Sequence, residues 1–206
     1  EHVGFMSIWP AFIRGVWFDN VIACYILLIP LVAVSISALF NYYGKILWNV
    51  TCIFFSLFYG IVLLVTAANI PYFQYFFKII NSSVFNWFGY MNTTAGMVFG
   101  ETSYYPPLIG FLLTLVLFIW LMRRLIRHFQ RLLNTKNPSV FWLDRIYIFL
   151  TAGICIGLCL FGIRGRTGYN PIKVSAAYYC TDPFLNQLGI SPVFNLLSST
   201  LDDSRT

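Results

Sequence analysis

The chain has 206 residues, of which 59% are hydrophobic and only 10% are charged, and its mean hydropathy is +0.74. A water-soluble globule of this size has too little polar surface to cover so apolar a chain, since soluble domains carry about 25% charged residues. The net charge of +6 comes without a soluble basic module, which argues against a nucleic-acid partner. The composition therefore indicates a membrane protein.

Four stretches without Asp, Glu, Lys or Arg predict the membrane spans. Each contains a continuous apolar segment close to the roughly 20 residues that cross a bilayer as a helix, and helices satisfy their own backbone groups in lipid. Pro30 and Gly60 fall inside the first two stretches, as is common in membrane helices. We expect an all-α bundle whose transmembrane helices lie at about 21–41, 46–68, 106–122 and 145–163.

The segment between the second and third spans is rich in aromatic residues. Its sequence, IPYFQYFFKIINSSVFNWFGYMN, covers residues 70–92 and mixes rings with amides and a lysine. Side chains of this kind favour the headgroup boundary, where one end of a ring is wet. We expect one or two short interfacial helices here, with most of the rings packed against the bundle.

A basic loop, residues 123–142, separates the third and fourth spans and predicts the orientation. Basic loops of membrane proteins stay cytoplasmic, so both termini and the aromatic segment are expected on the extracytoplasmic side. Two interpretations of the loop remain open: a topology signal that extends the third helix, or a short amphipathic helix lying on an anionic leaflet. Its basic residues are Arg123, Arg124, Arg127, Arg131 and Lys136.

Residues able to carry catalysis are scarce. The two histidines, His2 and His128, are expected on opposite sides of the membrane, and the carboxylates are scattered rather than paired. Four of the five cysteines fall inside spans, and Cys180 stands alone outside them. We therefore assign no catalytic, cofactor-binding or metal-binding residue within this chain.

The stretch GIRGRTGYNPIK, residues 162–173, follows the last span and combines glycines with basic residues. Glycine lets the backbone turn sharply on leaving the helix, and arginine at the depth of lipid phosphates can bind two oxygens at once. One hypothesis is a lipid-headgroup pocket built from Arg14, Arg164 and Arg166, with Asp19 holding one of them. The alternative is that these arginines only anchor the helix end at the interface.

Two segments resemble a known family. They are IRGVWFDNVIACYILLIP at residues 13–30 and GIRGRTGYNPIKVSAAYYC followed by NQLGISPVFNLLSS at residues 162–199. Together with the order of the aromatic segment and the basic loop, they resemble the N-terminal membrane region of bacterial lipoteichoic acid synthase-like proteins, a sulfatase and phosphoglycerol transferase family. The resemblance covers nearly the whole chain, and Asn170 and Ser191 depart from its usual pattern.

The resemblance implies a membrane anchor in the bacterial cytoplasmic membrane. Residues 164–206 would be an extracytoplasmic linker to a catalytic domain of the alkaline phosphatase superfamily, which is not in this sequence and would hold a threonine nucleophile with Mn or Mg. An enzyme of this kind transfers a phosphoglycerol-type headgroup from a phospholipid to an envelope glycan or glycolipid. A sulfatase or a phosphoethanolamine transferase is the alternative within the family, and membrane lipids and the chain's own C-terminal domain are the implied partners.

Two functions from other classes remain open. A small polytopic transporter would need a mid-membrane site at a helix broken near Pro30 or in a re-entrant 70–92 segment. An assembly subunit would dock on another membrane protein through small residues of the last span, Ala152, Gly153 and Gly157.

Overall fold

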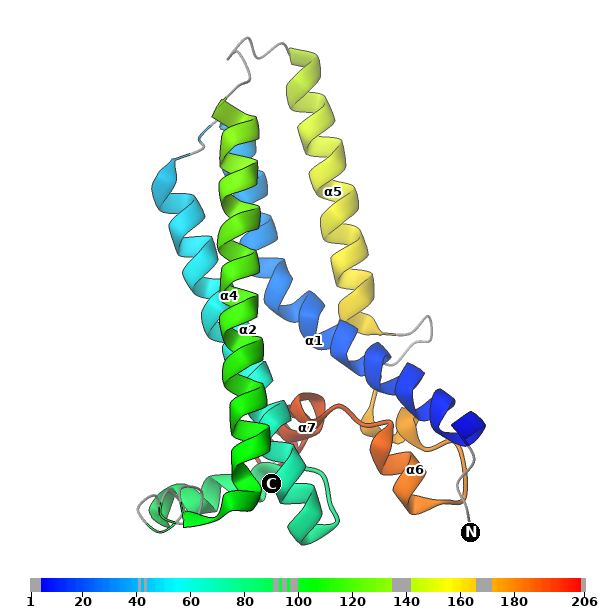
Figure 1. Ribbon diagram of the computed structural model, residues 1–206. Coiled ribbons are helices and arrows are strands. Elements are labelled where there is room, and N and C mark those ends of the chain that lie inside the picture. The colour runs from blue at the N-terminus through cyan, green and yellow to red at the C-terminus, as the bar shows by residue number, and fades with distance from the viewer. Residues whose placement is uncertain are drawn as a thin grey trace.

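The computed structural model describes residues 5–40, 42, 44–90, 93, 96, 100–134, 142–165 and 172–204. Its regular elements in these ranges are all helices, which confirms the all-α expectation (Figure 1). Four are long, namely α1 (Phe5–Leu39), α2 (Lys45–Phe76), α4 (Tyr105–Asn134) and α5 (Trp142–Arg164). The short ones are the 3₁₀ helices η1 (Ser82–Tyr90), η2 (Thr102–Tyr104) and η3 (Val174–Ala177) and the α-helices α6 (Pro183–Leu188) and α7 (Pro192–Asp203).

The four long helices are long and apolar enough to cross a membrane, as expected. The segments that meet this criterion are Ile8–Leu39, Lys45–Phe76, Thr102–Arg131 and Asp144–Arg164. At most 17% of the residues in their most apolar windows are buried inside the chain. Most side chains of the spans therefore face outward, and lipid or another membrane protein has to cover them.

The long helices form two pairs, α1 with α5 and α2 with α4, joined by a narrower contact between α1 and α2 (Figure 1). Rings connect the second pair, because the centroids of Tyr59 and Phe118 are 5.3 Å apart. The first pair approaches closely, since the Cys159 thiol donates to the Cys24 carbonyl at 3.1 Å and Gly162 lies directly against the Cys24 side chain. A side chain at Gly162 would collide with Cys24.

The first helix begins at Phe5, so its expected start near residue 21 was wrong. Arg14 and Asp19 end the charge-free stretch, but both are compatible with a helix and neither stops it. A helix of 35 residues is about 52 Å long, against a hydrocarbon core of about 30 Å. Part of α1 must therefore lie beyond the hydrocarbon, and Figure 1 shows its N-terminal part running obliquely over α6.

The second helix also exceeds its expected range, since it continues through Pro71 to Phe76. It takes up the first part of the aromatic segment 70–92, which was expected to form separate helices. Phe77, the residue after the helix, is in a left-handed conformation with φ of 55°, and its N–H donates to the carbonyl of Phe73. Only the second part of the segment forms a short helix of its own, η1, which contacts α7.

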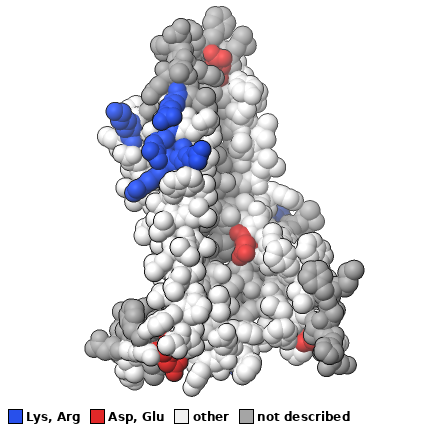
Figure 2. All heavy atoms as spheres, viewed as in Figure 1, with Lys and Arg blue, Asp and Glu red and all other residues white. Residues whose placement is uncertain are grey.

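The third long helix runs through most of the basic loop and ends at Asn134, so its expected end near residue 122 was wrong. Arginine, leucine and glutamine are good helix formers, and a charge marks where lipid ends rather than where a helix ends. Of the two interpretations of the loop, the structure shows the helix extension. Figure 2 shows the resulting cluster of Lys and Arg near one end of the molecule. We call this end the basic end.

Gly165 lets the chain turn back after α5. Its φ is +70°, a left-handed conformation that costs other residues about 1 kcal/mol or more. The Ile172 N–H then donates to the Arg164 carbonyl at 3.2 Å, which brings the returning chain beside the helix end. A Cβ at Gly165 would lie 2.7 Å from Ile172 Cγ2 and 3.0 Å from Val21 Cγ2.

We expect Gly165→Ala to lower the free energy of unfolding by about 2 kcal/mol or more, because the left-handed backbone and the contact with Ile172 both oppose a Cβ. The measurement is thermal unfolding in detergent. Gly157→Ala is the matched control, since it lies in α5 with no atom within 4 Å of the added Cβ, and it should unfold like wild type. Equal midpoints for the two variants would contradict the role of Gly165.

Candidate functional site

Residues 172–204, which include η3, α6 and α7, pack around the first half of α1 at the end of the bundle opposite the basic end (Figure 1). We call this segment the C-terminal collar. The sequence predicted an extracytoplasmic linker over residues 164–206, and its described part folds into short helices. Its core with α1 contains Phe18, which is fully buried, and the other buried members are Val21, Ile79, Ile80, Ile172, Ala177 and Ile190.

One face of α1 supplies the contacts with the collar. Ala11, Arg14, Phe18 and Val21 follow one another at spacings of three and four residues, which places them on one side of a helix. The ring of Phe18 lies 4.7 Å from the ring of Phe194 in α7, centroid to centroid. The first half of α1 and the collar therefore form one packed unit, although about 160 residues separate them in the chain.

Arg14 is held by the collar through two contacts. Its guanidinium donates to the carbonyl of Ala176, and its guanidinium carbon lies 4.8 Å from the centroid of the Tyr179 ring. The pKa of the Tyr179 phenol is raised above its ordinary value, chiefly by burial, while the Arg14 charge opposes the shift. The phenol therefore stays neutral at physiological pH, with its ring available to the cation.

Of the other proposed headgroup residues, Asp19 lies on a different side of α1 from Arg14. Asp19 is exposed, and five residues of helix put it about 140° around the axis from Arg14. Arg164 is exposed at the end of α5. Arg166 lies outside the described residues. The structure thus shows Arg14 engaged with the collar rather than with Asp19, and headgroup binding by these residues stays a prediction.

Asn186 organises the middle of the collar and was not identified from the sequence. Its side chain is 8% exposed, and its Oδ1 accepts from the backbone N–H groups of Tyr179 at 3.0 Å and Cys180 at 3.2 Å. Its Nδ2 donates to the Cys180 carbonyl at 2.7 Å. Asp182 caps α6 by accepting from the Phe184 N–H at 2.9 Å. The Asp-Pro pair at 182–183 is the sequence signal that predicts this helix start.

Three further polar side chains fix the turn after α2. The Ile80 N–H donates to Asn69 Oδ1 at 2.9 Å, and the Ile80 carbonyl accepts from Asn195 Nδ2, also at 2.9 Å. The Ser82 N–H donates to Ser199 Oγ at 2.9 Å. These contacts tie α2 and α7 together across about 120 residues of sequence. The turn has no regular secondary structure, so its buried backbone depends on these side chains.

The chemistry of the collar is that of positioning. The collar groups that make the contacts above are side-chain amides, hydroxyls and the Asp182 carboxylate, and Arg14 of α1 adds a guanidinium. All of them bind and orient neighbouring groups. Within the ranges that the structure describes, no three His, Cys, Asp or Glu side chains lie close enough together to hold a metal ion. The arrangement fixes how the chain leaves the bundle after α5.

We expect Asn186→Ala to loosen the collar, because three partly buried backbone groups lose their partner, at a cost of up to about 1–3 kcal/mol for each group left unsatisfied. The readout is the rate at which a membrane-impermeant maleimide labels Cys180, the one cysteine outside the spans, together with the unfolding midpoint. Gln187→Met is the control, since the buried Oε1 of Gln187 has no hydrogen-bond partner. Wild-type labelling and stability in Asn186→Ala would rule out this role.

Arg14→Met should destabilise the collar by about 2 kcal/mol, because it keeps the apolar stem and loses both the charged hydrogen bond and the stacking on Tyr179. Limited proteolysis of the collar in membrane vesicles checks this, with faster cleavage expected. Arg131→Gln removes an exposed arginine at the basic end and should leave cleavage unchanged. Identical cleavage of Arg14→Met and wild type would show that the collar does not need Arg14.

Comparison of the chain with protein-family models, with curated proteins and with solved structures finds no match. The functional inference therefore depends on the residues and geometry described above and on the resemblance carried by the sequence.

Proposed function

We propose that this chain is the membrane-anchoring portion of a lipoteichoic acid synthase-like enzyme. One observation supports the proposal most. The two segments that carry the resemblance, 13–30 and 162–199, contact each other through Arg14 with Ala176 and Phe18 with Phe194. Motifs far apart in a sequence that pack into one unit are consistent with a shared structural task, here the collar.

In this proposal the collar positions an extracytoplasmic catalytic domain above the membrane. That domain would hold the nucleophile and a Mn or Mg ion. The described chain would fix the position at which the polypeptide leaves the membrane bundle. The reaction is transfer of a phosphoglycerol-type headgroup from a phospholipid to an envelope glycan or glycolipid. The basic end faces the cytoplasm of a bacterium, in keeping with the positive-inside rule, and the collar end faces out.

The donor lipid requires a cation near its phosphate at the collar end. Because the Arg14 guanidinium already binds the Ala176 carbonyl of the collar, the proposal assigns the headgroup contact to Arg164 and Arg166. A guanidinium binds two phosphate oxygens in a planar fork, which orients the phosphodiester as well as attracting it. Arg164 is the last residue of the fourth span, and Arg166 follows two residues later in the sequence, so the proposal places both near a phospholipid headgroup.

The test uses the full-length product of the native gene, reconstituted with phosphatidylglycerol labelled in its headgroup glycerol. We expect release of diacylglycerol, transfer of the label to an acceptor, and loss of both on chelation of Mn and Mg. The double variant Arg164→Gln with Arg166→Gln should raise KM for the lipid about tenfold or more, whereas Arg131→Gln should not. Turnover of phosphatidylethanolamine alone would favour the phosphoethanolamine transferase, and no phospholipid turnover at all would refute the proposal.

A second candidate, an assembly subunit, is favoured by the small buried share of the spans. Added side chains at Gly153 and Gly157 of α5 would meet no atom within 4 Å, so a partner helix has room to approach there. Stoichiometric co-purification of another membrane protein, lost in a Gly153→Leu variant, would support this function over the anchor. A transporter would instead give solute flux in liposomes that contain this chain alone.

A further inference from the structure

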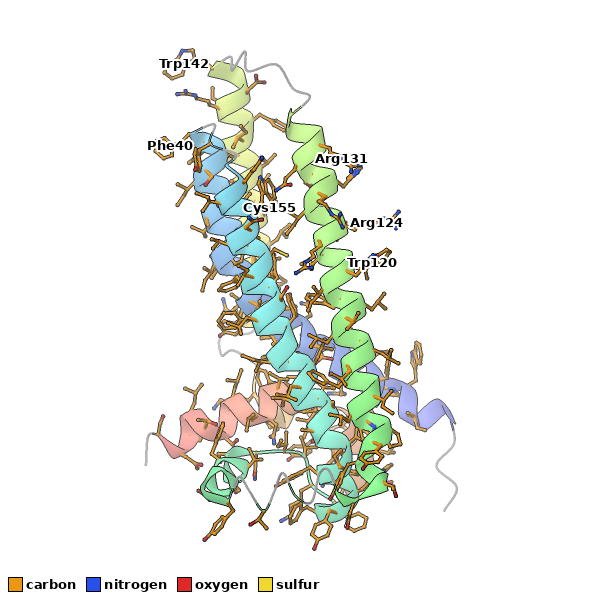
Figure 3. The ribbon with its side chains drawn as sticks, turned by 60° about the vertical axis from the view of Figure 1, so that its left-hand side comes forward. Phe40, Trp120, Arg124, Arg131, Trp142 and Cys155 are labelled. Carbon is orange, nitrogen blue, oxygen red and sulfur yellow. The ribbon has the colours of Figure 1, made fainter. Side chains whose placement is uncertain are left out.

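The C-terminal part of α4 carries its arginines on one side. At about 100° per residue, the side chains concerned fall within a sector of about 100° of the helix circumference. Figure 3 shows three of them, Trp120, Arg124 and Arg131, on the same side of α4 and directed away from α2. We call this set the arginine face, and its members are Trp120, Arg123, Arg124, Arg127 and Arg131.

The arginine face is turned away from the bundle. Contacts of α4 with α2 are made by Phe118, against Tyr59, and by Leu115, against Gly60, which lie on the opposite side of the helix. All four arginines are exposed, and among the described residues no carboxylate forms an ion pair with them. The contacts that the structure gives them are within α4: Arg127 Nε donates to the Arg123 carbonyl at 3.1 Å, and Arg124 lies 5.3 Å from the centroid of the Trp120 ring.

Four like charges on this face repel one another. Arg123 and Arg131 are about 12 Å apart along the axis, and successive arginines of the face are only about 1.5–6 Å apart along it, less than the Debye length of about 8 Å at physiological salt. An anion placed against the face relieves this repulsion. The pattern therefore calls for a negatively charged partner from outside the chain.

The depth of the face indicates what that partner is. The apolar part of α4, residues 105–122, is about 27 Å long and nearly fills the hydrocarbon core of about 30 Å. Arg123, Arg124 and Arg127 follow within about 8 Å, the depth of the headgroup layer, while Arg131 lies about 13 Å past Met122. Trp120 lies just inside the boundary, where tryptophan is enriched.

We propose that Arg123, Arg124 and Arg127, together with Trp120, bind the headgroup of an anionic phospholipid in the leaflet at the basic end. Each guanidinium offers a planar fork to the lipid phosphate, and Trp120 orients Arg124 by stacking. A zwitterionic lipid has the same phosphate but brings an ammonium among the arginines, so the face selects lipids with net negative charge. The surface lies at the opposite end from the collar, and the inference does not depend on the proposed function.

The test compares phosphatidylglycerol with phosphatidylcholine. Binding of each lipid to the detergent-solubilised full chain is titrated by native mass spectrometry. We expect wild type to prefer phosphatidylglycerol and the triple variant Arg123→Gln, Arg124→Gln, Arg127→Gln to lose most of that preference, roughly a hundredfold at about fivefold per arginine. Retention of the full preference in the triple variant would overturn the proposal.

Arg131→Gln is the matched control, because the removed charge belongs to the same face and lies beyond the headgroup layer. It should lose less than twofold, and a loss as large as that of Arg124→Gln would overturn the assignment of depth. Since basic residues also direct insertion, the triple variant can fail to insert. In that case the single Arg124→Gln variant, which keeps the other three arginines of the face, should lose about fivefold. An unchanged preference in Arg124→Gln would then overturn the proposal.

Discussion

The burial of Phe18 is the interaction on which the arrangement depends. Its side chain is fully enclosed where α1, the turn after α2 and the collar meet, and its ring contacts Phe194. Burial of such a side chain away from water stabilises a protein by about 1.5–3 kcal/mol. The lateral faces of the spans gain little from similar burial, because lipid tails are as apolar as the side chains themselves. Among the described residues, the larger buried hydrophobic cluster lies at the collar end.

This core explains how distant parts of the chain are held in register. Gly165 turns the chain after α5 so that Ile172 reaches the core beside Val21. Asn69 and Asn195 bring the turn after α2 to the same place by binding the two backbone groups of Ile80. Polar groups buried in this way specify one arrangement, since any shift leaves them unsatisfied. The contacts α1 to α5 and α2 to α7 are thus fixed at one end of the bundle.

The sequence predicted the number of spans and the helical class because lipid permits few structures, and uniform hydropathy is a strong signal. It did not predict the helix ends at Phe5 and Asn134. A charge shows where the hydrocarbon ends, whereas a helix ends where propensity or capping stops it, and neither Asp19 nor Arg123 does so. The sequence predicted an apolar stretch within each long helix and missed the parts of the helices that extend beyond it.

The candidate site was predictable only in part for a related reason. Arg14 was predicted as a site residue because it is a charge near a span. Its partners, the Ala176 carbonyl and the Tyr179 ring, are brought to it by a tertiary contact that no local sequence pattern encodes. Asn186 and Asn195 look like ordinary loop and helix residues in the sequence. Their importance comes from the backbone groups that the fold brings to them. Asp182, by contrast, acts within four residues, and its role as a cap is readable from the sequence.

The two ends of the molecule constrain the long helices in different ways. A helix longer than the hydrocarbon core is free to tilt or to slide along the membrane normal at small cost. At the collar end, Phe18 and Arg14 hold the oblique first part of α1 against α6 and α7, which fixes its direction. At the basic end, exposed arginines of α4 resist entry into the hydrocarbon, which fixes depth but not direction. The collar end thus fixes the direction of α1, and the basic end fixes the depth of α4 in the membrane. Together these two constraints determine the height above the membrane surface at which the chain leaves the bundle after α5.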